Sequence, residues 1–282
     1  MTQRSITLAD VLVHLSEQEQ RLLPKRWQVV GDIVVVKLKE PLLKRGKEVA
    51  RALLVMHPSC RCVVADFGIE GQLRTPKRVM VYPEGESPYT VHRENGVLYA
   101  MDVCKVMFSK GNQLERMRMG HVGKGEVVVD MFAGIGYFSL PCAVWASPER
   151  VYAMELNPVA HRYLCEGITM NHVEDRVVPM LGSCLALEPP ESAQRVIMGL
   201  IGEFTVVGDP VSYLERAIAF LDGAGVIHYH ESVPSKLSPE RPLGHIEQAA
   251  HSEGVCSEVM GVRRVKKFSP GVDHVVVDIK IF

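Results

Sequence analysis

The sequence lacks the long apolar runs and the targeting signals of membrane and secreted proteins. No stretch of its 282 residues approaches the run of about 20 apolar residues that a membrane-spanning helix needs. The N-terminal residues, MTQRSITLADVL, do not have the basic, apolar and small-residue order of a signal peptide. We therefore expect a cytoplasmic protein without a membrane partner.

Cysteine pairs and clusters of metal ligands are also lacking. The seven cysteines are scattered and include no C-x-x-C pair, and the eleven histidines are dispersed apart from His228 and His230. We expect reduced thiols and no bound metal. Because the formal net charge is only −1, any binding of nucleic acid must come from a local basic face.

The sequence does have enough apolar residues, 47% of the total, for a sizeable core. Leucines at helical spacing predict a leader helix within residues 1–24. Residues 25–104 contain short strand-like runs and the hairpin signal Asn95-Gly96, which predict a small α+β domain. We expect residues 105–125 to connect it to a catalytic domain at 126–282. The runs in the small domain are strands at 28–38, 60–67, 77–82, 89–94 and 97–102, and a helix at 44–56.

One stretch, Val127 to Phe138, has the order strand, turn and helix start. Its first three residues are β-branched, which is typical of a strand buried on both faces of a parallel sheet. Asp130 ends the strand. Gly134 and Gly136 then lie in the turn, where the backbone bends sharply and a ligand can approach main-chain N–H groups.

A second signal, Glu155, ends the next predicted strand. It lies roughly 20 residues past the glycines, where a carboxylate can bind ribose hydroxyls. The missing third glycine and the acid before the turn, Asp130, argue against a dinucleotide fingerprint and favour the S-adenosylmethionine version of the fold. The alternative is a glycine-rich turn in an unrelated α/β domain.

Strands and helices alternate from this turn to the C-terminus. The predicted strands are 127–129, 151–154, 176–180, 196–198, 225–229, 255–265 and 274–282, and the helices begin at 137, 158, 210 and 240. The last two strands have no helix between them. The order predicts an α/β fold of the class I S-adenosylmethionine-dependent transferases: Rossmann-like, with a mostly parallel seven-stranded sheet and a C-terminal antiparallel hairpin.

Several segments together carry a resemblance to a known family. They are Val30-Gly31-Asp32-Ile33, Glu94-Asn95-Gly96, Phe108-Ser109, Glu115-Arg116, VDMFAGIG at 129–136, Arg195-Val196-Ile197-Met198, Gly225-Val226-Ile227-His228-Tyr229 and Pro270-Gly271-Val272. With them the chain resembles, from Trp27 to Phe282, the archaeal and eukaryotic family that modifies the purine next to the tRNA anticodon. That family includes the tRNA guanine N1-methyltransferase and the aminocarboxypropyltransferase of wybutosine synthesis.

Two departures favour the second branch. The methyltransferase has arginine where this chain has Gly111, and it has Asn-Leu-Pro where this chain has Gly199-Leu200-Ile201. Gly199, with HYHE at 228–231, is similar to the aminocarboxypropyltransferase branch. The resemblance then implies transfer of the 3-amino-3-carboxypropyl group of S-adenosylmethionine to 4-demethylwyosine in tRNA-Phe, with release of methylthioadenosine. The alternative is methyl transfer to guanine N1 at the same position.

The resemblance also implies a set of residues around S-adenosylmethionine: Phe132, Gly134, Gly136, Glu155, Ser183 and Cys184. The glycines would shape the turn under the methionine part, and Glu155 would accept the ribose hydroxyls. Ser183 or Cys184 would line the adenine. For Cys184 the alternative is a small buried side chain.

Further residues are expected at the reacting end. Ser109 and Arg116 would hold the methionine carboxylate or position the base, since a guanidinium suits a carboxylate bidentately. His228 and His230, at the end of the fifth predicted strand, are expected with Arg116 to be catalytic residues.

Each of these assignments has an alternative. Arg116 and Arg118 could form a solvated helix face paired with Glu115, and His228 and His230 could both pack against a helix.

A basic segment near the C-terminus is a candidate contact for tRNA phosphates. Its cations are Arg263, Arg264, Lys266 and Lys267, and a solvated strand face is the alternative. Two other classes of function remain open, a non-catalytic tRNA-binding protein and a methyltransferase of small molecules or proteins. The first predicts an eroded cofactor turn, and the second leaves residues 25–104 unexplained. The sequence makes no prediction of the oligomeric state.

Overall fold

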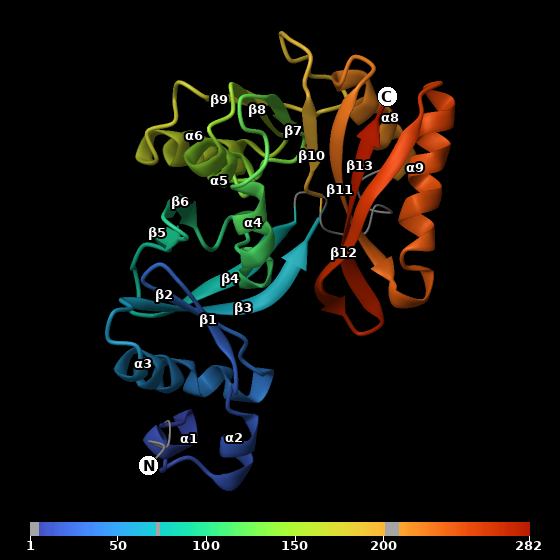
Figure 1. The fold of residues 1–282 in the computed structure, drawn as a ribbon. Helices are drawn as coiled ribbons and strands as arrows, with labels where there is room; N and C mark the ends of the chain where they lie inside the picture. Colours follow the sequence, from blue (N-terminus) through green and yellow to red (C-terminus); the bar gives the residue numbers. More distant parts are fainter. Residues whose placement is uncertain (1–5, 72–73, 201–208) are drawn as a thin grey trace, which may run out of the picture. The chain divides into compact units, whose positions relative to one another are not determined.

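The computed structural model describes residues 6–71, 74–200 and 209–282 (Figure 1). The chain forms two compact units. The N-terminal unit comprises Met1–Arg93 and Ala100–Lys110, and the C-terminal unit comprises Glu94–Tyr99 and Gly111–Phe282. In the described residues no helix is long and apolar enough to cross a membrane. The four segments expected from the sequence, with boundaries at residues 24, 104 and 125, stay a prediction.

The leader is two short helices, α1 (Leu8–Val11) and α2 (Glu17–Leu22), and not the single helix that its leucines predict. The break has a local cause. Ser16 begins α2 with a capping box, in which its hydroxyl accepts a hydrogen bond from the Glu19 backbone and the Glu19 carboxylate accepts one from Ser16. The leucines at the predicted spacing are still buried: Leu8, Leu12 and Leu15.

A four-stranded sheet in the order β1-β2-β3-β4 is the centre of the N-terminal unit. Its strands are β1 (Trp27–Val30), β2 (Ile33–Val36), β3 (Cys62–Glu70) and β4 (Thr75–Tyr82). The single strand predicted at 28–38 is an antiparallel hairpin, because Gly31 adopts a positive φ of 55° and turns the chain. The 3₁₀ helix η1 (Glu40–Arg45) and α3 (Gly46–Met56) cross from β2 to its parallel neighbour β3.

A hairpin of β5 (Tyr89–Glu94) and β6 (Val97–Asp102) forms a separate two-stranded sheet. Its turn residues Asn95 and Gly96 have φ values of 50° and 82°, as a two-residue turn with both central residues left-handed requires. The hairpin predicted from Asn-Gly is confirmed.

The C-terminal unit contains a seven-stranded sheet in the order β12-β13-β11-β10-β7-β8-β9. The strands are β7 (Val127–Asp130), β8 (Arg150–Glu155), β9 (Val177–Leu181), β10 (Arg195–Met198), β11 (Gly225–Pro234), β12 (Ser257–Ser269) and β13 (Val272–Ile281). The strands β9, β8, β7, β10 and β11 are parallel, whereas β13 pairs antiparallel with both β11 and β12. The predicted mostly parallel sheet with a C-terminal antiparallel hairpin is confirmed.

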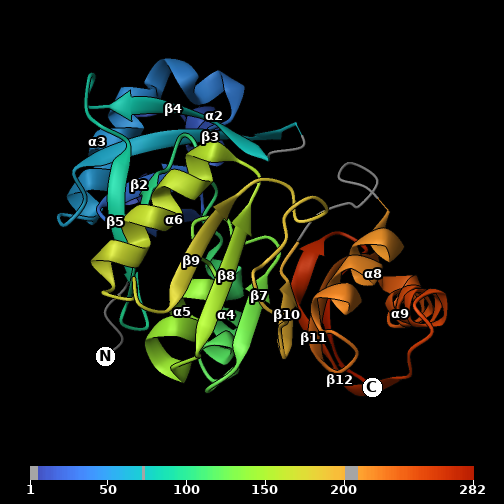
Figure 2. The same ribbon diagram turned by 90° about the horizontal axis from the view of Figure 1, so that it is seen from above.

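Helices cover both faces of this sheet (Figure 2). Among the described residues, the helices of the unit are α4 (Gln113–Met119), α5 (Ser139–Pro141), the π-helix η3 (Cys142–Ala146), α6 (Pro158–Met170), α8 (Pro210–Phe220), the 3₁₀ helix η4 (Ser235–Leu237) and α9 (Glu240–Ser252). The 3₁₀ helix η2 (Lys110–Asn112) includes residues of both units. One face forms an apolar core with α8 and α9, in which Ile227 and Tyr229 of β11 take part. Since side chains alternate along a strand, His228 and His230 belong to the other face.

Candidate functional site

The turn after β7 is organised by Asp130, which is fully buried. Its carboxylate accepts hydrogen bonds from the Ser139 hydroxyl at 2.6 Å and from the Phe132 backbone N–H at 3.3 Å. Burial raises the pKa of the Asp130 carboxyl to about 6, and these two donors oppose the shift. The side chain that ends the strand thus fastens both sides of the turn.

The two glycines of the turn are required by its shape. Gly134 and Gly136 have φ values of 59° and 90°. A Cβ on Gly134 would lie 2.4 Å from the Tyr137 ring, and one on Gly136 would lie 2.5 Å from Leu140. Both the left-handed backbone and the close packing exclude larger residues. These are the glycines that the sequence singles out.

Glu155, the last residue of β8, is brought against this turn. One carboxylate oxygen accepts the Gly134 backbone N–H at 2.7 Å, and the other accepts that of Asn157, also at 2.7 Å. Burial raises the pKa of Glu155, and the backbone donors oppose it. Each carboxylate oxygen has a second lone pair, so the group can also accept hydroxyl donors. This geometry fits a cofactor with a ribose.

Three other predicted cofactor residues have different surroundings. Ser183 follows β9, and its hydroxyl accepts the Leu185 backbone N–H at 3.3 Å. Cys184 is 4% exposed and belongs to the apolar core, and burial raises the pKa of its thiol to about 12. Phe132 is half-buried, with its ring edge-on to Tyr213 at 5.3 Å. Their contact with an adenine stays a prediction.

Arg116 on α4 is 2% exposed and forms a bidentate ion pair with Glu94, at 2.6 Å from Nε and 2.9 Å from Nη2. The alternative of a solvated helix face paired with Glu115 therefore does not describe Arg116. It is Arg118 whose Nε lies 3.0 Å from Glu115. Ser109 belongs to the N-terminal unit and is half-buried.

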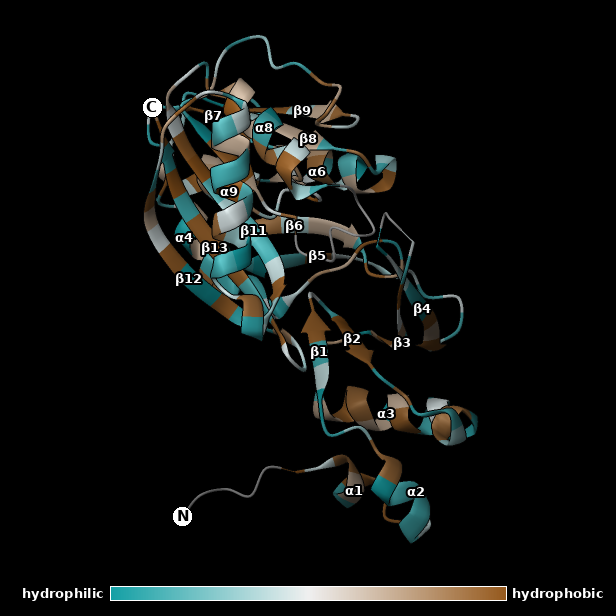
Figure 3. Cartoon of the chain, turned by 90° about the vertical axis from the view of Figure 1, so that its right-hand side faces the viewer, coloured by the Kyte–Doolittle hydropathy of each residue, from teal (hydrophilic) through white to brown (hydrophobic). Residues whose placement is uncertain are grey.

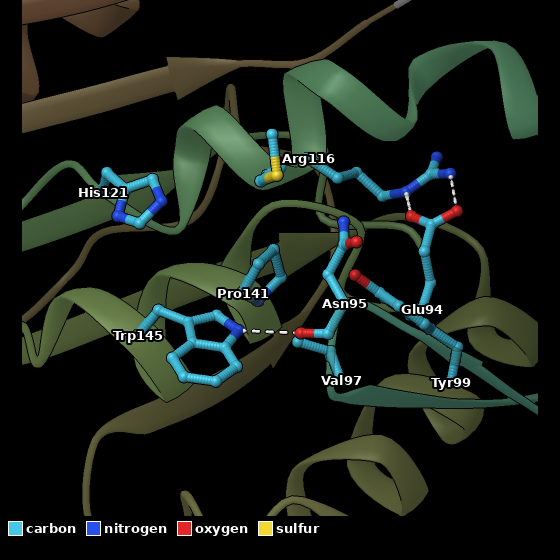
Figure 4. Close-up of a pocket in the computed structure, with 9 residues that line it drawn as sticks. Glu94, Asn95, Val97, Tyr99, Arg116, His121, Pro141 and Trp145 are labelled. Atoms are coloured by element: carbon cyan, nitrogen blue, oxygen red, sulfur yellow. Dashed lines mark hydrogen bonds and ion pairs between the residues drawn. The ribbon is translucent and has the colours of Figure 1, made fainter.

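The Arg116–Glu94 pair lies at one side of a pocket of about 240 Å³ (Figure 4). At its other side Trp145 donates its indole N–H to the Asn95 carbonyl at 3.1 Å. The lining residues are Glu94, Asn95, Val97, Tyr99, Arg116, Met117, His121, Pro141 and Trp145. Sequence reasoning did not single out this pocket, because the hairpin, α4 and η3 that form it are far apart in the chain.

His228 is 3% exposed and is held at both ring nitrogens. Nε2 lies 2.7 Å from Arg195 Nη1, which can only donate, so Nδ1 carries the proton and donates to Asp278 at 2.6 Å. Burial lowers the pKa of His228. The residue is therefore a neutral imidazole with a fixed tautomer.

His230 is completely buried and contacts a histidine that the sequence did not indicate, His274 of β13. His230 Nδ1 and His274 Nε2 are 3.1 Å apart, and the centroids of the Phe138 and His230 rings are 5.1 Å apart with the rings tilted by 34°. Burial lowers the pKa of both histidines to about 3. Only the register of β11 against β13 places them together, and no local pattern reports that register.

The predicted position of His228 and His230 at the end of their strand is wrong. β11 continues to Pro234, because β13 pairs with it over its whole length. It is the neighbouring strand β10 that ends earlier, at Met198, opposite Tyr229. His230 therefore lies one residue beyond the end of β10, on the side of the sheet where the turn after β7 lies.

In the described residues no group of three or more histidine, cysteine, aspartate or glutamate side chains is arranged to hold a metal ion. The turn after β7, Glu155 and the buried histidines can instead bind a ligand through hydrogen bonds and charge.

Comparisons with known proteins bear on both units. Residues 90–259 match the family described as "TRM5/TYW2 methyltransferase domain", and residues 8–87 match "TYW2 N-terminal domain". The tRNA(Phe) (4-demethylwyosine(37)-C(7)) aminocarboxypropyltransferase of Methanocaldococcus jannaschii is 40% identical over 90% of this chain and 97% of the relative. The enzyme of the same description from Pyrococcus horikoshii is 36% identical over 95% and 93%.

Solved structures of both branches of this family are similar to this chain. P. horikoshii TYW2 in complex with MeSAdo has a TM-score of 0.83 and 33% identity over 98% of each chain. M. jannaschii TYW2 in complex with AdoMet has a TM-score of 0.72 and 35% identity over 91% of this chain and 99% of that one. A structure from the methyltransferase branch is also similar: Trm5b of Pyrococcus abyssi has a TM-score of 0.84 and 33% identity over 99% of this chain and 82% of that one. The family resemblance found in the sequence is confirmed.

Proposed function

Because the chain belongs to the TRM5/TYW2 family, we propose that it transfers the 3-amino-3-carboxypropyl group of S-adenosylmethionine to 4-demethylwyosine in tRNA-Phe. One observation carries the choice of branch: residues 8–87 match the family described as "TYW2 N-terminal domain". In agreement with it, the M. jannaschii aminocarboxypropyltransferase is 40% identical to this chain, whereas the P. abyssi guanine methyltransferase is 35% identical.

The surroundings of Gly199 support the same branch. A Cβ at this position would lie 2.6 Å from the Phe138 ring, whose centroid is 5.1 Å from that of the His230 ring. The asparagine of the methyltransferase pattern would therefore require the Phe138 ring to move. At Gly111, where that pattern has arginine, a Cβ would lie 2.9 Å from the Lys266 side chain, which is flexible and can move aside. Of the two departures from the methyltransferase pattern, the packing therefore supports the one at Gly199.

The turn after β7 fits S-adenosylmethionine, since it has a left-handed glycine cradle and a carboxylate beside it. When bound, that group supplies an electrophilic γ-carbon on its sulfonium, and attack there releases methylthioadenosine. Gly134 and Gly136 let the backbone approach the methionine part, and Glu155 accepts the ribose hydroxyls. Phe132, Ser183 and Cys184 enclose the adenine.

Arg116, His228 and His230 of the C-terminal unit are proposed as residues of the transfer end, and Ser109 is proposed from the family resemblance alone. Arg116, His228 and His230 are buried and have fixed partners, which supports a role in positioning the groups around them. A dry and ordered site lowers the barrier of a displacement by holding the two carbons in line.

The acceptor in this proposal is tRNA-Phe that carries 4-demethylwyosine, met in the cytoplasm. β12 offers cations to its phosphates, and hydrophilic residues recur along this edge strand (Figure 3). Part of that charge is neutralised, because Arg263 pairs with Asp278 and Arg264 with Asp273. Lys267 is exposed.

The experiment uses S-adenosylmethionine labelled either on the methyl or on the carboxyl carbon, with tRNA-Phe carrying guanosine or 4-demethylwyosine. We expect carboxyl label to enter only the tRNA with the tricyclic base, with methylthioadenosine as the second product. Glu155→Ala, which removes the carboxylate from the turn, is the negative control, and Glu253→Ala on the surface is its matched control. Methyl label in the guanosine tRNA would instead establish the methyltransferase, and label in neither would leave a tRNA-binding protein.

A further inference from the structure

Three buried polar atoms at the end of β11 and the start of β13 have no hydrogen-bond partner among the described residues. They are His230 Nε2, Ser232 Oγ and His274 Nδ1. Ser232 pairs with His274 across the two strands, and His230 lies two residues before Ser232 on the same face. Each residue is at most 4% exposed. Because buried polar atoms without partners are rare, such a cluster points to a ligand or to chemistry.

The proton positions in this cluster follow from its charges. Burial holds the pKa of both histidines near 3, so each is neutral and carries one proton. His230 Nε2 lies 3.5 Å from Glu115 Oε1 without a hydrogen bond between them, and the negative charge of this carboxylate, which also pairs with Arg118, favours the proton on that nitrogen. His230 Nδ1 is then an acceptor, and His274 Nε2 donates to it across 3.1 Å. The remaining nitrogen, His274 Nδ1, is left as a bare acceptor.

The row Glu115, His230, His274 runs from α4 toward the side of the sheet where ligands bind. β10 ends at Met198 opposite Tyr229, so His230 and then His274 lie beyond that end. The ring of Phe138, which follows the turn after β7, contacts that of His230 with centroids 5.1 Å apart. In open α/β sheets the ligand site lies outside the carboxyl ends of the strands, and His274 is the member of the row farthest in that direction.

The geometry points to a proton relay: we propose that His274 Nδ1 accepts the proton that leaves the ring carbon of the acceptor base, with Glu115 and His230 as positioning residues. The inference rests on the proposed function. The ring carbon forms a bond to the γ-carbon, and the carbon–sulfur electron pair leaves with methylthioadenosine. The ring carbon then loses its proton to His274 Nδ1, and the electrons of that C–H bond restore the aromatic ring. His274 passes its Nε2 proton to His230, which passes its own to Glu115.

A weakly basic imidazole suits this step. The alkylated ring is a cation whose proton is strongly acidic, so a weak base removes it. The same weakness keeps Nδ1 unprotonated at neutral pH. Since His274 is fully buried, the side chains around it move when the base enters, as in other sites that close on their substrate.

The first test compares wild type with His274→Gln, using acceptor tRNA with hydrogen or deuterium on the reacting ring carbon. We expect the transfer rate to fall by about 10²–10⁴-fold, the usual contribution of a general base. A primary isotope effect should appear in the variant and be absent from the wild type, because proton loss becomes the slow step. His251→Gln on the surface of α9 is the matched control.

The second test needs no turnover. Nitrogen NMR of the histidine rings should show a protonated Nε2 and a bare Nδ1 on His274. In Glu115→Gln the amide can donate to His230 Nε2, so the protons should shift and His274 should become protonated at Nδ1. Wild-type His274 with a protonated Nδ1, or an unchanged rate and isotope effect in His274→Gln, overturns the relay. Wild type that transfers no carboxyl label at all would instead refute the proposed function.

Discussion

At the scale of single residues, the ion pair between Arg116 and Glu94 is the interaction whose removal we expect to matter most for stability. Their side chains are 2% and 6% exposed, and the pair is bidentate. If one partner is removed, the buried charge of the other still has the free-energy cost of desolvation but no longer has the attraction that offset this cost.

We therefore predict that Glu94→Ala lowers the free energy of unfolding by about 3–5 kcal/mol, the range for breaking a buried pair. Denaturant unfolding of the folded variant measures it. Glu84→Ala is the matched control, because Glu84 forms an ion pair with Lys47 that is exposed on both sides. That control should leave the free energy of unfolding close to the wild-type value, because an exposed ion pair contributes little. A decrease in Glu94→Ala no larger than in Glu84→Ala would contradict the prediction.

At the scale of elements, β12 is the part of the proposed tRNA contact that can be tested by charge. It is an edge strand with bulges between Val259 and Gly261 and again between Arg264 and Lys266. Bulges and charges on an edge strand keep it from pairing with other chains. If the same charges also bind tRNA phosphates, the affinity for tRNA depends on salt concentration, whereas protection of the strand edge does not affect that affinity.

We predict that Arg264→Glu combined with Lys267→Glu weakens tRNA binding and lowers the slope of log affinity against log salt by about 2, roughly one for each phosphate that the variant no longer neutralises. Binding measured over a range of salt concentrations gives the slope. Arg162→Glu combined with Lys280→Glu, two exposed cations on other elements, is the matched control. If both double variants have the wild-type slope, β12 does not contact phosphates.

The elements also show what a sequence can predict and where it stops. The turn after β7 was predictable because its glycines and its two carboxylates are constrained by local geometry, and the Asn95-Gly96 hairpin was predictable for the same reason. The length of β11 was not, because after Tyr229 the chain becomes polar while pairing with β13 continues to Pro234. The site residue His274 was missed for that reason: it is distant in the chain and enters only through register.

At the scale of the whole molecule, the pH dependence of the free energy of unfolding is the sum of the effects of several buried groups. His230 and His274 have an ordinary pKa of 6.5 and a pKa of about 3 in the fold. Between these values the unfolded chain binds the protons and the folded chain does not, so these histidines make the protein less stable as the pH falls. Asp130, with its pKa raised from 3.8 to about 6, acts in the opposite direction, and Glu155 does so as well.

Because these effects oppose one another, the wild-type curve alone does not separate them, whereas the difference between wild type and His274→Gln does. We predict that wild type loses up to about 1.4 kcal/mol more than the variant per pH unit as the pH falls below about 6, since one proton fewer is linked to unfolding in the variant. Denaturant unfolding between pH 7 and pH 4 measures this difference. His251→Gln, an exposed histidine, should follow the wild-type curve. Parallel curves for wild type and His274→Gln would mean that His274 binds its proton in the fold at the same pH as in the unfolded chain, which contradicts an imidazole that burial keeps neutral.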